Sequence, residues 1–380
     1  MNYVMLKEVC SINMGQSPDS DSYNENREGV PFFQGNADFG ERYPVTRKWC
    51  TSPTKMAEPE DILISVRAPI GAMNYAKEEC CIGRGLAALT PDKTKVSPEF
   101  IFWLLKGKNE ELNSKGTGST FKAIGRKVLE ETLVPDIALE TQLEYSTILE
   151  KVYAVIQNRK EELIKLDDLI KARFVEMFGD TVTNSMNWEE HVLSEYIVFL
   201  TSGSRGWAQY FTDESGEVFI TIKNVKNNHI NLDNVQYIMA PNNKEAERTK
   251  VQAGDLLISI TADLGRTGVV DEDIASKGAY INQHLSLVRL DSSKISPLYV
   301  SYFLETEGGK RQFESRNQNG VKAGLNFDAI KSLRILVPDK KLQEEYLQFV
   351  KQVDKSKVVI QKALDETQLL FDSLMQKYFG

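Results

Sequence analysis

Three histidines and one glycine-rich loop are the parts of this sequence whose residue types could support catalysis or nucleotide binding. His191, His229 and His284 lie far apart and none has a nucleophile beside it, so structural or solvent-exposed roles are expected for them. The loop GTGSTFK at 116–122 is superficially like a phosphate-binding loop, but Phe121 takes the glycine position before the lysine. Motifs for amino-group methylation are also absent. The sequence therefore predicts no catalytic residue in this chain.

Cysteine and charge patterns narrow the remaining chemistry. The four cysteines form no Cys-x-x-Cys pair, so reduced cytosolic thiols are expected rather than a zinc site. They are Cys10, Cys50, Cys80 and Cys81. We expect no metal and no cofactor on this chain. Lys7 and Glu8 interrupt what would have to be an apolar signal segment, so the sequence predicts a cytoplasmic protein without a membrane span.

The formal net charge is −8. A protein that wraps nucleic acid by bulk electrostatics alone is expected to be basic. The field of this chain therefore does not attract phosphate strongly, and any binding to DNA must depend on local contacts or on partners.

The sequence repeats itself about two hundred residues apart. EPEDILISVRAPIG at 58–71 returns without a gap as QAGDLLISITADLG at 252–265, and VSPEFIFWLL at 96–105 returns as ISPLYVSYFL at 295–304. LVPD occurs at 133–136 and again at 336–339. Solenoid repeats run roughly 20–50 residues, so this period indicates a duplicated domain.

Each copy begins with short β-branched or aromatic runs separated by turn residues, which predicts strands and loops. Examples are VPFFQGN, DILISV and GLAALTP in the first copy, and EVFITIKNV, DLLISI and HLSLVRL in the second. A short helix is expected after Ser97-Pro98 and after Ser296-Pro297, because proline is favoured at the first helical position.

Each copy ends in a long segment with helical periodicity. Residues 142–179 and 343–380 align at an offset of 201, with apolar residues spaced three and four apart as in a coiled coil. The pattern favours an antiparallel pair within the chain, because roughly 38 residues at ~1.5 Å each exceed the length of one domain. The alternative is that each helix packs on its own domain. The predicted interface residues are Leu149, Val152, Ile156, Leu163, Leu166, Ile170, Met177, Val350, Val353, Ile360, Leu364, Phe371 and Leu374.

Both predicted helix seams contain polar residues, at different places. Arg159 and Arg173 interrupt the first, while Lys357 and Thr367 interrupt the second. Burying unpaired charge costs several kcal/mol, about 3–5 when one partner of a pair is removed. Pairing two unlike helices would let these long side chains reach the interface edge instead.

The predicted fold is α+β, with a pseudo-twofold internal repeat. Two tandem strand-rich domains, at 1–139 and 181–339, are separated by two long helices, at 140–180 and 340–380, that form an antiparallel intramolecular coiled coil. The helices would then act as a spacer between the two domains.

This ordered set of motifs resembles the specificity subunit of type I restriction-modification systems, over essentially the whole chain. The resemblance rests on Gly15-Gln16-Ser17-Pro18, on the GDLLIS strand, and on the loop GSTFKAIGRKVLEETLVPDIALETQ at 118–142 that leads into the long helix. The second copy departs from the pattern, because the segment from Ser202 to Trp207 lacks the proline.

The resemblance implies that each globular domain is a target-recognition domain that reads one half of a split double-stranded DNA sequence. The helix pair would set the gap between the half-sites. It would also carry two methyltransferase subunits, which hold S-adenosylmethionine, with restriction subunits in the full complex. Basic partners could then neutralise the DNA phosphates while this chain supplies base contacts.

Polar and basic loop residues are the candidate DNA contacts, since amides and guanidinium groups can read base edges. In the first copy they are Gln16, Ser17, Gln34, Asn36, Arg67, Arg84, Lys115 and Lys122. In the second they are Arg205, Trp207, Lys223, Asn224, Arg266, Gln283, His284, Arg316 and Lys322. Each could instead be a solvated loop residue, and Arg67 and Arg84 could equally pair with Asp61 or with nearby glutamates, as buried structural arginines do.

Other functions stay open at this point. The chain could be a structural or regulatory scaffold whose two modules bind proteins, an inactive specificity paralogue, or a modification enzyme with a novel active site. Because the two copies differ most in their loops, a specificity subunit of this sequence is expected to recognise two unlike half-sites.

Overall fold

The structure is a computed structural model that describes residues 2–118, 122–213, 215–317 and 324–380. Its contacts divide the chain into two compact units. Unit 1 comprises Met1–Glu162 and Ile360–Gly380, and unit 2 comprises Leu163–Val359. Each unit therefore holds one strand-rich domain together with part of each long helix.

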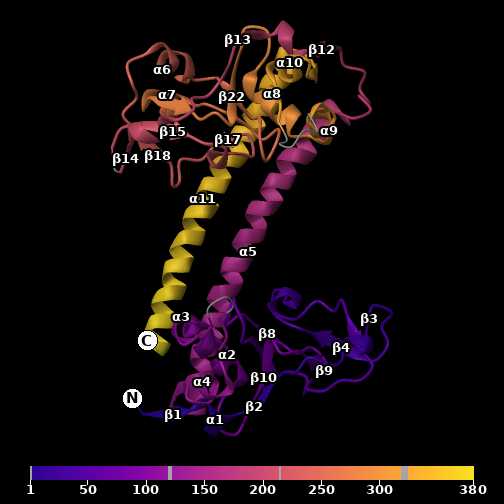
Figure 1. Ribbon diagram of the computed structural model, residues 1–380, viewed down its shortest axis with the longest axis vertical. Coiled ribbons are helices and arrows are strands. Elements are labelled where there is room, and N and C mark those ends of the chain that lie inside the picture. The colour runs from indigo at the N-terminus through magenta and orange to yellow at the C-terminus, as the bar shows by residue number, and fades with distance from the viewer. Residues whose placement is uncertain (1, 119–121, 214, 318–323) are drawn as a thin grey trace. The chain divides into compact units, whose positions relative to one another are not determined.

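Unit 1 contains a four-stranded antiparallel sheet in the order β2-β10-β7-β8 and a five-stranded sheet in the order β3-β5-β4-β9-β6 (Figure 1). A third sheet pairs β1 with β11. The strands are β1 (Tyr3–Met5), β2 (Cys10–Met14), β3 (Tyr23–Asn24), β4 (Val30–Phe33), β5 (Trp49–Cys50), β6 (Met56–Ala57), β7 (Ile62–Ser65), β8 (Met73–Tyr75), β9 (Cys80–Ile82), β10 (Leu86–Pro91) and β11 (Leu133–Pro135). The helices are α1 (Leu6–Val9), α2 (Pro98–Gly107), α3 (Asn109–Ser114), α4 (Arg126–Glu130) and the long α5 (Leu139–Phe178), with 3₁₀ turns η1 (Ser20–Ser22) and η2 (Asn36–Asp38).

Unit 2 repeats the four-stranded sheet as β13-β22-β19-β20, and adds β14-β18-β15-β21 and the pairs β12-β23 and β16-β17. The strands are β12 (Glu190–Val192), β13 (Ile197–Ser202), β14 (Phe211–Thr212), β15 (Glu217–Ile220), β16 (Val225–Lys226), β17 (His229–Ile230), β18 (Gln236–Ile238), β19 (Leu256–Ser259), β20 (Thr267–Val269), β21 (Ala279–Ile281), β22 (Leu285–Leu290) and β23 (Arg334–Leu336). The helices are α6 (Lys244–Thr249), α7 (Glu272–Ser276), α8 (Pro297–Leu304), α9 (Glu307–Arg316), α10 (Phe327–Lys331) and the long α11 (Lys340–Phe379), with 3₁₀ turns η3 (Leu193–Glu195), η4 (Trp207–Tyr210) and η5 (Ile222–Asn224). The α+β class and the duplication predicted from the sequence are confirmed.

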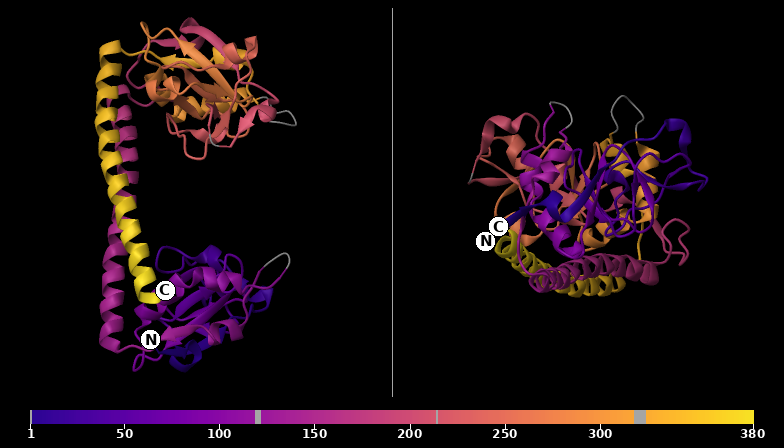
Figure 2. Two further views of the ribbon diagram at one scale, coloured as in Figure 1. Left: turned by 90° about the vertical axis from the view of Figure 1, so that its left-hand side faces the viewer. Right: turned by 90° about the horizontal axis from the view of Figure 1, so that it is seen from below.

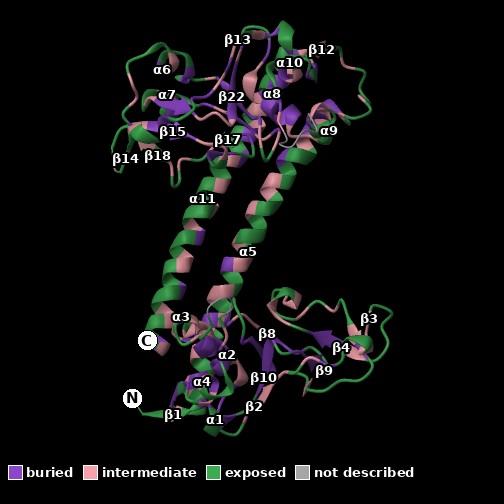
Figure 3. Ribbon diagram, in the orientation of Figure 1, coloured by how far each residue is buried: buried purple, intermediate pink, exposed green. Residues whose placement is uncertain are grey.

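The short helix that follows each four-stranded sheet begins where the sequence predicts it. Ser97 caps α2 by accepting a hydrogen bond from the amide of Phe100, and Ser296 caps α8 in the same way. Proline stands at the first helical position in both. Six residues of each helix are buried, so both are core helices rather than surface helices (Figure 3).

A buried glutamine near the start of each long helix ties that helix to its own domain. Gln142 Oε1 accepts from the amide of Ser97 at 2.9 Å, and Gln343 Oε1 accepts from the amide of Ser296 at 3.1 Å. Their amide nitrogens donate to backbone carbonyls just before the helix, at Ile137 and at Pro338. The duplication therefore preserves this clamp atom for atom.

Within unit 1 the N-terminal part of α5 lies beside the C-terminal part of α11 (Figure 1 and Figure 2). Tyr145 stacks on Tyr378 with ring centroids 3.9 Å apart, and Tyr153 lies near Phe371. Residue numbers increase along α5 in the direction in which they decrease along α11, so the two segments are antiparallel. Phe371 also contacts Trp103 of α2, so the helices pack both on each other and on their domain.

Unit 2 contains the corresponding contacts between the other ends of the helices. Tyr346 of α11 donates a hydrogen bond to the carbonyl of Ile170 and packs edge-on against Phe174 and Phe178 of α5. Tyr299 of α8 joins the same aromatic cluster. All thirteen residues predicted for the helix interface are buried or half-buried.

The polar residues of the helix seams have partners. Arg159 donates to the carbonyl of Ala363 and to Thr367 Oγ1, the latter at 2.7 Å. Lys357 bonds Asp167 at 2.6 Å, and Arg173 bonds Glu176 at 2.7 Å. Two of the seam interruptions, Arg159 and Thr367, therefore satisfy each other within unit 1.

The four cysteines are buried and free. Among the residues that the structure describes, no helix has the length and apolar character needed to cross a membrane.

Candidate nucleic-acid interface

The first candidate interface is the edge of unit 1 at which β2, β4 and β7 end and β10 begins. β10 runs antiparallel to both of its neighbours, with Ala87 opposite Met14 and Leu86 opposite Ser65. β4 pairs with β9, which leads into β10. The loops that leave these strands therefore meet. We call the segments 15–17, 34–36, 66–68, 83–85 and 122–124 the strand-end edge of unit 1.

Backbone hydrogen bonds hold these segments together. The amide of Gln16 donates to the carbonyl of Ile82 at 3.0 Å, and that of Gly85 donates to Gln34 at 3.2 Å. The amide of Val66 donates to Gly85 at 2.9 Å, and its carbonyl accepts from Ile124 at 2.9 Å. The edge is thus a fixed platform rather than a set of independent loops.

The strand-end edge brings together most of the first-copy residues predicted to contact DNA. They are Gln16, Ser17, Gln34, Asn36, Arg67, Arg84 and Lys122. Lys115 precedes Thr117, which pairs with Ala123 at the edge, but its ammonium bonds Glu111 at 2.5 Å. Lys115 is therefore already paired in the free protein.

Three cations of this edge are exposed and available. Arg67, Arg84 and Lys122 are exposed, and no hydrogen bond or ion pair from their charged groups is present among the described residues. The alternative that Arg67 or Arg84 pairs with Asp61 is wrong, because the buried Asp61 carboxylate accepts from the amide of Glu58 at 2.9 Å. Free guanidinium groups on a rigid edge are suited to bind phosphates or base edges.

Unit 2 has the same edge, where β13, β15 and β19 end and β22 begins. The amide of Ser204 donates to the carbonyl of Ile281 at 2.9 Å, and that of Asn282 donates to Ile220 at 3.0 Å. The amide of Ile260 donates to His284 at 3.0 Å. The strand-end edge of unit 2 comprises the segments 203–205, 221–223, 260–261, 282–284 and 324–325.

The second edge carries a different set of side chains. Arg205 and Lys223 are exposed, while Gln283 and His284 are half-buried. His284 Nδ1 lies 2.7 Å from Thr261 Oγ1, and its Nε2 lies 3.3 Å from Gln283 Nε2. One scaffold therefore presents guanidinium and amide groups in unit 1 and a linked threonine, histidine and glutamine in unit 2.

Two predicted DNA contacts are wrong because the side chains are buried. Trp207 is only 4% exposed and packs with Phe219 and Tyr280 in a core cluster. Asn224 is 5% exposed, and its Oδ1 accepts from the amide of Thr221 at 2.9 Å, which caps a 3₁₀ turn. In this structure both side chains are instead engaged within the fold of unit 2.

Two other predicted contacts have partners inside the protein. Arg266 bonds Asp263 at 2.6 Å. Arg316 donates to both the hydroxyl and the carbonyl of Ser332, at 2.9 Å each, and burial lowers the pKa of its guanidinium. Lys322 lies outside the described residues.

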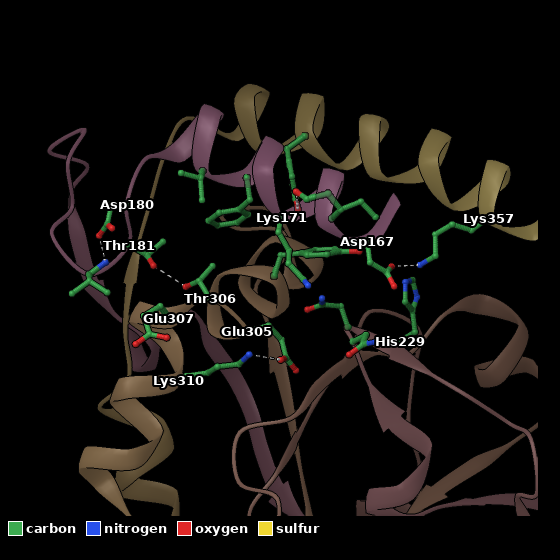
Figure 4. A pocket seen from close by; sticks show the side chains of 18 residues that line it. Asp167, Lys171, Asp180, Thr181, His229, Glu305, Thr306, Glu307, Lys310 and Lys357 are labelled. Carbon is green, nitrogen blue, oxygen red and sulfur yellow. Dashed lines mark hydrogen bonds and ion pairs between the residues drawn. The ribbon is translucent and has the colours of Figure 1, made fainter. Parts of the chain in front are cut away.

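A pocket of about 500 Å³ in unit 2, which no sequence pattern indicated, is lined by residues of α5, β17, α8, α9 and α11 (Figure 4). Its lining includes the aromatic residues Phe174, Tyr302 and Tyr346 and paired charges such as Lys357 with Asp167. Its lining residues lie outside the strand-end edge of unit 2, so this pocket is a separate feature. Its volume falls in the range of small-ligand and side-chain pockets.

The family described as type I restriction modification DNA specificity domain matches residues 1–167 and 204–367. The putative type I restriction enzyme MjaX specificity subunit of Methanocaldococcus jannaschii is 44% identical over 156 residues, which are 41% of this chain and 37% of that protein. The type I restriction enzyme EcoBI specificity subunit of Escherichia coli is 20% identical over 412 residues, covering 99% of this chain and 85% of the relative.

Two solved structures share the fold. The type I restriction-modification system S subunit of M. genitalium has a TM-score of 0.59 at 14% identity, covering 100% of this chain and 96% of that one. A chain from a study of assembly and conformational transition of the type I R-M system has a TM-score of 0.55 at 17% identity, covering 100% and 97%. The chain therefore belongs to the family of type I restriction-modification DNA specificity domains, and it carries that domain twice.

Proposed function

We propose that this chain is the non-catalytic specificity subunit of a type I restriction-modification complex and recognises a bipartite, asymmetric double-stranded DNA sequence. Each strand-end edge contacts one half-site, and α5 with α11 acts as the spacer that fixes the gap between the half-sites. The proposed location of this chain is the cytoplasm, because the DNA that it would recognise is there.

One observation carries the proposal. The same platform of strand ends is built twice with the same backbone hydrogen bonds, yet it presents unlike side chains in the two units. A structural duplication has no need to vary at one edge while it preserves the buried clamp of Gln142 and Gln343. Two domains that recognise different base sequences need that variation.

The negative charge of the chain supports a requirement for partners. With a net charge of −8, the chain alone is expected to bind DNA weakly, because phosphate contacts supply most non-specific affinity. We therefore propose that two methyltransferase subunits surround the DNA together with this chain, and that restriction subunits join the full complex. S-adenosylmethionine would be held by the methyltransferase subunits.

The surface of the long helices offers a docking site for two equivalent partners. Leu169 of α5 and Leu370 of α11 stand at equivalent positions of the repeat, and their exposed fractions are 46% and 51%. Two copies of one partner that bind the two halves of a repeat would contact the same position in each half. Because the positions are related by the repeat, each leucine would contact one copy of the same subunit.

The partner contacts are tested by native mass spectrometry of the complex with the methyltransferase subunit encoded with this chain. Wild type is expected to hold two copies, while Leu169→Glu and Leu370→Glu should each hold one. Met239→Glu is the matched control, because Met239 is an exposed hydrophobic residue that follows β18 and lies on neither long helix. Two copies retained in both leucine variants would reject these contacts.

The DNA function is tested by selection from a pool of random duplexes with the purified complex of this chain and its methyltransferase subunit. Two short conserved blocks of unlike sequence at a fixed spacing are expected. A stable complex that selects no sequence would favour the regulatory or inactive alternative. Binding should also weaken steeply with salt.

A further inference from the structure

The turn before β10 and the turn before β22 occupy the same place in the two units. The amide of Leu86 donates to the carbonyl of Gly83 at 3.0 Å, and the amide of Leu285 donates to Asn282 at 3.1 Å. Both are therefore four-residue turns closed by the same hydrogen bond. Arg84 and Gln283 are the second residues of the two turns, so one position carries a guanidinium in unit 1 and an amide in unit 2.

Each turn is the centre of its strand-end edge, because it bonds to three neighbouring loops. In unit 1, Gly15 donates to Leu86, Gly83 donates to Phe33, and Val66 donates to Gly85. In unit 2, equivalent bonds join the turn 282–285 to Gly203, Ile220 and Ile260. A side chain on a turn held by several backbone hydrogen bonds has the fixed position that a base contact requires, whereas phosphate contacts carry no sequence information directly.

Among the residues that the structure describes, none forms a hydrogen bond or ion pair with the Arg84 guanidinium. The side chain is exposed, and the next residue is Gly85, which has no side chain to contact it. The backbone of the turn is fixed instead, since the amide of Arg84 donates to Ser17 Oγ at 3.3 Å. The five donors of an arginine fork match the O6 and N7 acceptors of guanine in the major groove.

Gln283 lies beside His284, the residue that replaces Gly85 in the second copy. Its Nε2 is 3.3 Å from His284 Nε2, while its Oε1 is buried and has no hydrogen-bond partner among the described residues. Rotating the Gln283 side chain toward a ligand would therefore break no hydrogen bond accepted by its Oε1. A glutamine amide donates to N7 and accepts from the N6 amino group of adenine.

We propose that Arg84 specifies a guanine in the half-site bound by unit 1 and that Gln283 specifies an adenine in the half-site bound by unit 2. The inference rests on the proposed function, and it adds which residue sets which base. Arg67 and Thr261, which follow β7 and β19 at equivalent places, flank these two positions. Thr261 bonds His284, whereas the Arg67 guanidinium has no partner in the part of the chain that the structure describes, so the two edges also differ beside the central turn.

The test is selection from random duplexes with the complex of this chain and its methyltransferase subunit, using wild type, Arg84→Gln and Gln283→Arg. Arg84→Gln should reduce the preference for guanine at one position of one block by roughly 5- to 150-fold, the range of a good bidentate pair. Gln283→Arg should change an adenine in the other block toward guanine. In each case the second block should keep its wild-type sequence.

Arg84→Lys separates base contact from phosphate contact. Lysine keeps the charge but lacks the planar fork, so the guanine preference should fall while total affinity changes little. Equal weakening of all sequences in Arg84→Gln, with an unchanged motif, would show a phosphate contact and overturn the inference. A wild-type complex that selects no motif at all would instead reject the proposed function, and the inference with it.

Discussion

Mutation of the ion pair between Asp255 and Arg289 tests how unit 2 stabilises the adjacent strands β19 and β22. Arg289 Nε and Nη2 each lie 2.7 Å from a carboxylate oxygen of Asp255, whose side chain is 1% exposed. In the first copy Asp61 is the equivalent aspartate, and Thr90 stands where Arg289 stands in the second. Arg289→Thr therefore converts the second copy to the first at this position.

Removing the arginine leaves a buried carboxylate whose remaining partner is the amide of Gln252 at 2.7 Å. Breaking a buried pair costs about 3–5 kcal/mol, and the threonine hydroxyl recovers about 1 kcal/mol. We expect a loss of about 3 kcal/mol in the free energy of opening of β19 and β22. Changing Asp255 to Asn in the same variant should restore most of it, because the uncompensated charge is then gone.

Hydrogen exchange with mass spectrometry measures this change separately in each unit. Backbone amides of β19 and β22 should exchange about 100-fold faster in Arg289→Thr, at roughly 1.4 kcal/mol per factor of ten. Amides of β7 and β10 in unit 1 serve as the internal control and should not change. A loss below about 1 kcal/mol, or an equal loss in both sheets, would refute the assignment of a buried, stabilising pair.

Three further changes test the fold and the interface. A Cβ at Gly203 would lie 2.0 Å from the carbonyl oxygen of Asn282, so Gly203→Ala should displace the turn 282–285 of unit 2. In a duplex selection the base preference should weaken in one conserved block only. A motif identical to that of the wild type would contradict this. Gln343→Leu leaves the amide of Ser296 without its acceptor and should cost about 1–3 kcal/mol, measured as faster exchange of α8 amides. Burial raises the pKa of the Asp61 carboxyl, so its contribution to stability is present below about pH 4 and is lost as pH rises through the raised pKa. When the unfolding temperature of unit 1 is measured at a series of pH values, it should decline over this range in the wild type and not in Asp61→Asn. An identical decline in the variant would show that the pKa shift of Asp61 is not its cause.

Much of the architecture could be predicted from the sequence because it is local or repeated. The gapless return of DILIS as DLLIS located β7 and β19, and serine with proline located the starts of α2 and α8. The three- and four-residue spacing of apolar side chains located α5 and α11 to within three residues at their starts. These signals depend on neighbours in sequence, which the sequence displays directly.

The failures concern residues whose environment is set by distant segments. Trp207 looked like a loop residue, but it packs with Phe219 of β15 and Tyr280 of β21 and is buried. The partner of Arg159 is Thr367, 208 positions away, and no local pattern connects them. Likewise, Arg84 and Gln283 are equivalent because the same backbone hydrogen bond closes the turn that holds each of them. Only the folded backbone shows that bond.

The central claim is that this chain alone dictates which DNA sequence is modified. The most direct measurement is methylome sequencing of a host that carries the methyltransferase subunit, with and without this chain. We predict a new split motif with two unlike halves, methylated only when this chain is present. The absence of any new motif from a host in which the complex forms, or a palindromic motif, would contradict it.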